Sequence, residues 1–253
     1  MQKIKLVLED GSEKEFESGI NALDIARDTG KELNNAIAIK LDGSILDLSA
    51  PIKKDGGIKF LTTGDKEGLS VLRHSTSHVM AAAVKELFPD VKVAIGPSIE
   101  EGFYYDFDKA EPFVPEDIEK IEAKMKEIIN SNAPFVRKVL SKEEAIEFFT
   151  KKGEPYKVEI IKELPAETVS LYETGNFIDL CTGPHIPSTK KIKVYKLLNV
   201  AGAYWRGDEK KKMLQRIYGT AFNTREELKE FLTRREEAQK RDHRKLGKEL
   251  DLY

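Results

Sequence analysis

Four side chains capable of acid–base or metal chemistry are concentrated in two short motifs of this 253-residue chain. Three of its four histidines and its single cysteine fall in His74-Ser-Thr-Ser-His78 and Cys181-Thr-Gly-Pro-His185. On a helix, a four-residue spacing brings both imidazoles of the first motif to one face, with Cβ atoms about 5–6 Å apart. A Cys-xxx-His pair from elsewhere in the fold can converge on them. The set predicts either a metal site or an acid–base cluster.

The composition is that of a soluble globular protein, with 40% hydrophobic and 34% charged residues and a net charge of −2. No apolar run approaches the roughly 20 residues that a membrane helix requires. The first ten residues turn acidic before the apolar segment of a signal peptide forms. A lone cysteine cannot form an internal disulfide, which fits a reducing compartment. We therefore expect a cytoplasmic protein of two compact units that has no membrane partner.

Basic side chains are unevenly distributed. Between residues 190 and 216 they greatly outnumber the acidic ones, which indicates a polyanionic partner such as RNA. A solvated surface without a partner is the alternative. The residues concerned are Lys190, Lys191, Lys193, Lys196, Arg206, Lys210, Lys211, Lys212 and Arg216.

The first 62 residues read as a small α/β unit. Alternating apolar residues predict strands over 4–8 and 14–16, and a helix follows from the capping Asn21 to Thr29-Gly30. Further short strands, separated by Gly and Asp turns, lie within 36–61. Strand, hairpin, helix and more strands is the order of a ubiquitin-like β-grasp. The polar segment 62–68 is the expected linker to a second unit.

The second unit has the pattern of an α+β domain. The helix that carries the first motif is expected over 69–88, where Pro89 ends it. Small alanines beside the histidines leave space for a ligand. Helices are also expected over 115–130, from the capping box at Ser141, and as one long charged segment from Thr224 to about Leu250. Strands of an antiparallel sheet are expected near 94–97, 102–108, 157–161, 169–172, 177–180 and 192–198.

Several motifs together resemble the amino-terminal half of bacterial threonyl-tRNA synthetases, over essentially the whole chain. They are the two His/Cys motifs, Gly96-Pro97, Gly102-Phe-Tyr-Tyr-Asp106, and Ala201-Gly-Ala-Tyr-Trp-Arg-Gly207. The resemblance implies a TGS domain over 1–62, an editing domain of the threonyl/alanyl type over 63–223, and a linker helix over 224–253. In that family the aminoacylation core, with its ATP and zinc, lies beyond Tyr253, so this chain is not expected to charge tRNA.

The resemblance also implies the activity, which is hydrolysis of seryl-tRNA for threonine. His74, His78 and His185 would transfer protons, and Cys181 would position a water molecule. A cation at Lys157 would stabilise negative charge that develops at the ester. Asp179 would hold the seryl ammonium. Tyr105, rather than its neighbour Tyr104, and Gly96 would complete the substrate pocket, because neighbours on a strand face opposite ways.

Binding of the tRNA end is assigned to five residues, of which Trp205 would stack and Arg206 would contact phosphate. A core tryptophan beside a salt-bridged arginine is the alternative. Zinc bound by the three motif histidines and Cys181 is a second alternative, since the related alanyl modules use the same pattern for zinc. The threonyl resemblance implies no metal. The remaining tRNA candidates are Lys210, Lys211 and Lys212.

Two other functions stay open at this point. One is a non-catalytic module that binds zinc or RNA, and the other is a free-standing trans-editing deacylase. The expected substrate partner is tRNA for threonine carrying serine. We expect this chain to be a monomer, whereas the resemblance implies a homodimer for the parent enzyme. The TGS unit could bind tRNA, bind a small molecule or aid folding.

Overall fold

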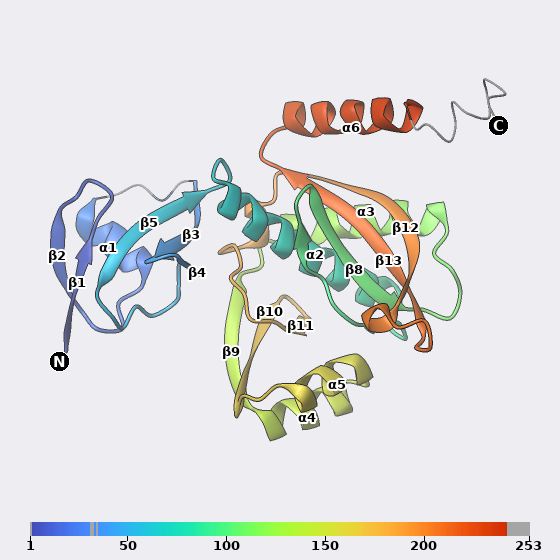
Figure 1. Cartoon of the computed structure of the whole chain (residues 1–253), viewed down its shortest axis with the longest axis horizontal. Coiled ribbons are helices and arrows are strands. Elements are labelled where there is room, and N and C mark those ends of the chain that lie inside the picture. Colours follow the sequence, from blue (N-terminus) through green and yellow to red (C-terminus); the bar gives the residue numbers. More distant parts are fainter. Residues whose placement is uncertain (1, 31–32, 34, 242–253) are drawn as a thin grey trace.

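The computed structural model describes residues 2–30, 33 and 35–241 of the chain. Within these residues the fold is a mixture of α-helices and three β-sheets (Figure 1). No helix in the described part of the chain is long and apolar enough to cross a membrane.

The first sheet is built from the amino-terminal residues and has the strand order β2-β1-β5-β3-β4. The helix α1 (Ala22–Thr29) packs on it, and the Asn21 side chain caps α1 by accepting from the Asp24 amide. Gly30 ends α1 in the left-handed conformation, which suits glycine. The strands are β1 (Lys3–Val7), β2 (Glu13–Glu17), β3 (Ala36–Leu41), β4 (Ser44–Leu46) and β5 (Gly56–Thr62).

The helix α2 (Lys66–Leu87) runs from the first sheet through the centre of the molecule (Figure 1). It is buried on almost all sides, including the small residues of 81–83, which lets neighbouring elements approach closely. Beside it lie α3 (Pro115–Asn130) and β8 (Gly102–Asp108). The third sheet has the order β12-β13-β8-β6, with β7 paired to β8. Its other strands are β6 (Lys92–Val93), β7 (Ser98–Ile99), β12 (Val194–Tyr204) and β13 (Met213–Phe222).

The second sheet has three antiparallel strands in the order β11-β10-β9. Two short helices, α4 and α5, pack against each other beside it (Figure 1). The chain leaves β11 at Leu180, and Cys181 and His185 lie in the loop that follows. These elements are β9 (Phe135–Ser141), α4 (Lys142–Lys151), α5 (Pro155–Glu163), β10 (Thr168–Thr174) and β11 (Phe177–Leu180).

Three details of the expected secondary structure are wrong. Residues 157–161 form part of the helix α5 rather than a strand, because Pro155 opens a helix whose Tyr156, Lys157 and Ile161 are buried by packing. Residues 94–97 form no strand. The expected linker 62–68 is only a short turn, since β5 runs to Thr62 and α2 starts at Lys66.

The expected carboxy-terminal helix is present as α6 (Arg225–Lys240), which the Thr224 side chain caps. Its expected continuation into 242–253 lies outside the described residues. Two short 3-10 turns complete the fold. They are η1 (Thr189–Lys191) and η2 (Trp205–Gly207).

Candidate active site

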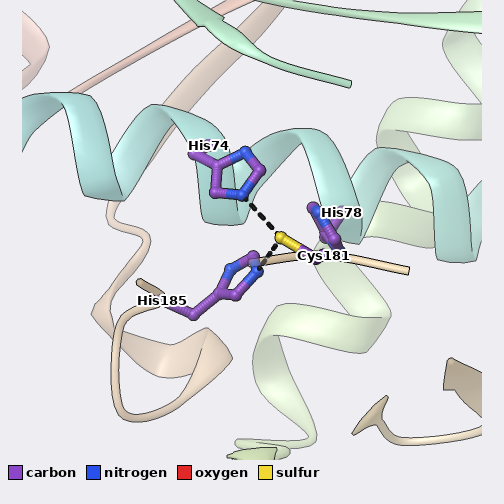
Figure 2. Close-up of side chains that lie close together, drawn as sticks. All are labelled: His74, His78, Cys181 and His185. Carbon is purple, nitrogen blue, oxygen red and sulfur yellow. Dashed lines mark hydrogen bonds between the residues drawn. The ribbon is translucent and has the colours of Figure 1, made fainter. Parts of the chain in front are cut away.

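The two His/Cys motifs meet in space. His74 and His78 project from α2 toward the loop after β11, which brings Cys181 and His185 (Figure 2). The Cys181 sulfur lies 3.1 Å from His74 Nε2 and 3.3 Å from His185 Nε2. One ligand atom from each of the four side chains lies within 4.8 Å of the others. The convergence that the sequence predicted is therefore present.

Hydrogen bonds fix the tautomer of His74. Its Nδ1 is 3.1 Å from the Gly96 carbonyl oxygen, which can only accept. Nδ1 must therefore carry the proton in the neutral ring, and Nε2 presents a lone pair to the Cys181 sulfur. The Ser77 hydroxyl contacts the same carbonyl at 2.8 Å.

The same reasoning applies to His185. Its Nδ1 lies 3.1 Å from the Ser75 hydroxyl, and that hydroxyl donates its one proton to the Val71 carbonyl at 2.8 Å. The oxygen is thus an acceptor for the imidazole, so His185 also has its proton on Nδ1. The Nε2 lone pair of His185 faces Cys181 as well.

The Cys181 sulfur is surrounded by more acceptors than it can satisfy. Two imidazole lone pairs point at it, and the Gly183 amide donates to it at 3.2 Å. A thiol has one proton and can donate to only one of the two rings. The other ring is left as an acceptor for a proton, a water molecule or a cation. This surplus of acceptors is what a proton-transfer site or a metal site needs.

Burial keeps these groups neutral. Desolvation lowers the pKa of His74, and it lowers the pKa of both His78 and His185 well below the ordinary value. Desolvation likewise raises the pKa of the Cys181 thiol to about 12. Neutral imidazoles can accept protons at physiological pH, whereas a thiol with this pKa is a poor nucleophile. The electrostatics favour base catalysis over a covalent thioester.

A buried charged network lies beside the cluster. The Lys157 ammonium, on α5, is 2.5 Å from Asp179 Oδ1, on β11, and both side chains are 2% exposed. The Tyr105 hydroxyl donates to Asp179 Oδ2 at 2.5 Å and lies 3.0 Å from the Lys157 nitrogen. No described residue donates an aligned hydrogen bond to Asp179 Oδ1. The Lys157 ammonium is close to this oxygen but is its ion-pair partner only. His78 Nδ1 is 3.7 Å from Asp179 Oδ2, which joins the network to the cluster.

The His/Cys cluster and the Lys157–Asp179 network both open into one cleft of about 770 Å³. Its walls come from α2, α5, the second sheet and the loop after β11, and include His74, His78, Cys181, Lys157 and Asp179. His185 is 1% exposed and lies behind Cys181. Apolar side chains line much of the remaining wall, among them Ile45, Ile95, Pro97, Val139, Ile160 and Leu180.

The two tyrosines of β8 face opposite ways. Tyr105 is fully buried against Asp179, whereas Tyr104 is half-buried on the other face beneath the Arg216 guanidinium. This is the alternation expected along a strand. Tyr105 is therefore the member of the pair that belongs to the site.

Gly96 closes the cleft next to Tyr105. A Cβ atom at this position would overlap the Tyr105 ring. We expect Gly96→Ala to lower the free energy of unfolding by about 1–3 kcal/mol, since a buried aromatic ring would have to move. Urea unfolding measures the change. Gly64→Ala is the matched control, because its Cβ would meet only ordinary contacts, and equal stabilities of the two variants would contradict the prediction.

The residues assigned to tRNA lie apart from the cluster and are largely paired with acidic side chains. Trp205 is buried and donates its indole N–H to Glu159 at 3.1 Å. The Arg206 guanidinium lies 2.6 Å from Glu163. This arrangement matches the packing alternative for Trp205 and Arg206. Lys211 pairs with Glu159, Lys212 pairs with Asp108, and Lys210 is exposed.

The donor set of the cluster fits zinc. Three imidazole nitrogens and one sulfur are a tetrahedral zinc set, for which neighbouring ligand atoms lie about 3.3–3.6 Å apart. The two measured sulfur–nitrogen distances, 3.1 and 3.3 Å, are close to that range. The hydrogen bonds from Nδ1 of His74 and His185 are also those that orient zinc-binding imidazoles.

Comparison with known proteins shows which proteins the chain is similar to. Residues 169–218 match the family model described as the threonyl and alanyl tRNA synthetase second additional domain. The whole chain is 56% identical to a threonine–tRNA ligase of Pelobacter propionicus. Over 99% of its length it is 53% identical to that of Acetivibrio thermocellus.

The chain matches the amino-terminal region of threonyl-tRNA synthetases. It spans about two-fifths of the length of these curated relatives, 40% in both cases. The second-additional-domain match covers Asp179, Cys181 and His185, whereas His74, His78 and Lys157 lie outside the matched residues. The candidate site is thus assembled from matched and unmatched segments.

Four residues of the candidate site were not predicted. The Ser75 hydroxyl orients the His185 imidazole by accepting from its Nδ1. The Ser77 hydroxyl contacts the Gly96 carbonyl oxygen, which also binds Nδ1 of His74. Their place between two histidines on one helix was a usable signal. Tyr172, on β10, contacts the His185 ring, and Asp47, in the loop after β4, accepts from the His185 backbone. Nothing local in the sequence marks Asp47, because its contacts with Tyr172 and His185 join positions more than a hundred residues apart.

Proposed function

We propose that this region hydrolyses the ester bond of seryl-tRNA for threonine. The observation that carries the proposal is the convergence of two imidazole Nε2 lone pairs on Cys181 at the wall of a cleft that also holds Lys157 and Asp179. A hydrolase needs a proton acceptor for water and a cation for the oxyanion, and this wall offers both.

The proposed reaction uses the chain's own side chains. A neutral imidazole, best placed at His74, takes a proton from water as the water oxygen attacks the ester carbon. The Lys157 ammonium stabilises the negative charge that forms on the carbonyl oxygen. The same proton then passes to the leaving ribose oxygen, which releases serine and tRNA. Cys181 positions the water. Asp179 Oδ1 accepts a hydrogen bond from the ammonium group of the seryl moiety.

Serine is the expected amino acid because it is hard to exclude in the synthetic reaction. Serine lacks one methyl group of threonine, and a difference of this size gives only about 1–3 kcal/mol of discrimination. A second site that admits serine and excludes the larger threonine corrects the errors. The name threonine–tRNA ligase of the relatives supports this choice of substrate.

We assign catalysis to the imidazoles without a required metal. If zinc is bound, His74, His78, Cys181 and His185 would hold it, and it would polarise a water only if a further coordination position opened. The support for direct action is the similarity to threonine–tRNA ligases, since the orientation of two rings by Gly96 and Ser75 suits a proton acceptor and a zinc ligand alike. A structural zinc module without activity is the second candidate, favoured by the donor set of the cluster.

We further propose the domain organisation that the resemblance implied. Residues 1–62 are assigned to a TGS domain of the β-grasp type, 63–223 to the editing domain, and 224–253 to a linker. The five-stranded first sheet with α1 and its own apolar core, which includes Leu6, Ile25 and Ile39, supports the first assignment. We propose a cytoplasmic location, tRNA as partner, and a monomer for this chain.

Paired deacylation assays test the proposed function. Release of amino acid is measured from seryl-tRNA and from threonyl-tRNA for threonine, with and without a chelator, and zinc is measured by elemental analysis. We expect faster loss of serine than of threonine in both conditions. Equal or absent hydrolysis of the two substrates would contradict the proposal. Stoichiometric zinc with unfolding on chelation would favour the structural module.

The pH dependence of the rate follows from the lowered histidine pKa values. The base must be neutral, and burial lowers the pKa of His74, so the neutral form persists below the usual value of about 6.5. We expect the midpoint of the acid-side fall in the background-corrected rate constant to lie below about pH 6.5. A rate that is already halved at about pH 6.5 would contradict a buried imidazole base.

A further inference from the structure

Asp47 reaches the candidate site from outside the editing domain. It lies just after β4 in the first sheet and is 8% exposed. Its Oδ1 accepts the backbone N–H of His185 at 2.6 Å, and its Oδ2 accepts the Tyr172 hydroxyl at 2.5 Å. Each carboxylate oxygen therefore has a buried partner beside the cluster.

These two partners hold the same segment from two directions. The Tyr172 and His185 rings are in contact, with centroids 4.4 Å apart. Tyr172 also lies over Gly183, where a Cβ atom would overlap the tyrosine hydroxyl. The His185 ring also stacks on Phe135, with centroids 4.7 Å apart. The Asp47 carboxylate thus fixes the backbone of His185 and the Tyr172 ring, which covers the loop from Cys181 to His185.

We propose that Asp47 is a positioning residue for His185 and that the first sheet is a structural part of the hydrolytic site. Asp47 acts through His185, whose backbone it anchors while Ser75 orients the imidazole. A buried amide and a buried hydroxyl would lose their partner without it, and the loop from Cys181 to His185 would shift. The inference rests on the proposed function, because deacylation is one of its readouts.

A second contact places the first sheet at the cleft. Ile45, on β4, lines the cleft and packs against the apolar core that contains α2. Ile37, Ala38 and Leu61 of the same sheet belong to that core as well. The first sheet is therefore packed against the helix that carries His74 and His78, so Asp47 has a rigid base from which to act.

Three substitutions separate positioning from charge. Asp47→Asn removes the charge but keeps both contacts, since its oxygen accepts from His185 and its amide donates to the Tyr172 oxygen. Asp47→Ala removes both contacts. Asp47→Glu keeps the charge but displaces it by one methylene. Asp55→Ala is the matched control, because Asp55 accepts the Lys5 amide in the same sheet and does not line the cleft.

The rate of seryl-tRNA deacylation is measured for each variant of the full chain. We expect Asp47→Ala and Asp47→Glu to lower kcat about 10- to 100-fold with little change in KM, as displaced catalytic groups do. Asp47→Asn and Asp55→Ala should stay close to the unsubstituted chain. Wild-type kcat in the Ala and Glu variants would overturn the proposal. So would an Asn variant as slow as the Glu variant, since charge would then be the requirement.

Amide NMR gives a readout that does not depend on activity. A short hydrogen bond to a carboxylate moves the His185 amide proton downfield, and we expect an upfield change in Asp47→Ala and Asp47→Glu but not in Asp55→Ala. An unchanged His185 amide in the Glu variant would overturn the positioning role. If the unsubstituted chain does not hydrolyse seryl-tRNA, the proposed function fails, and the amide shift alone decides the role of Asp47.

Discussion

Replacing His74 by alanine is expected to lower kcat for seryl-tRNA deacylation by about 10²–10⁴-fold, the usual contribution of a general base. His74 lines the cleft, and its Nε2 lone pair faces Cys181 while Nδ1 is held by the Gly96 carbonyl. Alanine removes the acceptor from the cleft wall but leaves Asp179, the proposed partner of the seryl ammonium, in place. KM should therefore change less than kcat. Single-turnover deacylation with seryl-tRNA measures the effect.

Two further variants isolate the lone pair as the cause. His74→Asn keeps a donor for the Gly96 carbonyl but offers no imidazole nitrogen to Cys181, so it should be as slow as His74→Ala. His243→Ala replaces the one histidine that belongs to neither motif, and it should leave the rate unchanged. A rapid His74→Asn variant would show that orientation, rather than proton acceptance, is the function of this residue.

Replacing Lys157 by methionine is expected to lower the free energy of unfolding by about 3–5 kcal/mol, as removal of one partner from a buried ion pair does. Methionine retains the apolar stem of lysine. It leaves the Asp179 carboxylate, whose side chain is only 2% exposed, without its cation. The Tyr105 hydroxyl remains as its neighbour. Deacylation should fall as well, because the same ammonium stabilises the oxyanion.

A double-mutant cycle separates the two roles of Lys157. Asp179→Asn removes the orphaned charge and keeps an acceptor for Tyr105, so the Lys157→Met/Asp179→Asn protein should regain much of the lost stability. It should not regain activity, since the cation is still missing. Urea unfolding and deacylation measure the two quantities. Additive losses of stability in the double variant would contradict a coupled pair.

The histidine cluster could be predicted because its signal is local. A four-residue spacing on a helix aligns His74 with His78, and the second motif holds Cys181 and His185 within one loop. Strand alternation predicted that only one of Tyr104 and Tyr105 faces the site, and in the structure Tyr105 is that residue. Caps were equally local, because Asn21 and Ser141 were predicted as caps and each caps the helix that it precedes.

The helix α5 shows where local signals fail. Val158, Ile160 and Ile161 are β-branched and favour a strand in isolation. Burial of Tyr156, Lys157 and Ile161 in the folded chain selects the helix that Pro155 begins. Tertiary packing thus outweighs the intrinsic preference of these residues.

The ion-pair partners of the basic residues could not be predicted from local sequence patterns either. The excess of cations between residues 190 and 216 predicted a polyanionic partner, and the structure adds that Arg206 and Lys211 pair with glutamates of α5 and Lys212 pairs with Asp108. The anionic partners lie 43 to 104 positions away, as the pairs Arg206–Glu163 and Lys212–Asp108 show. Asp47 escaped notice for the same reason, because its partners are in β10 and the His185 loop.

Nitrogen-15 NMR of the imidazole rings tests the central claim, that two neutral histidines present Nε2 lone pairs to Cys181. The measurement is made at about pH 7 on histidine-labelled, chelator-treated protein, where exposed imidazoles are largely neutral. We predict shifts of the Nδ1-protonated tautomer for both His74 and His185, with Nε2 unprotonated. A ring protonated at Nε2, or at both nitrogens, in either residue would contradict the proposal that this cluster is a proton acceptor.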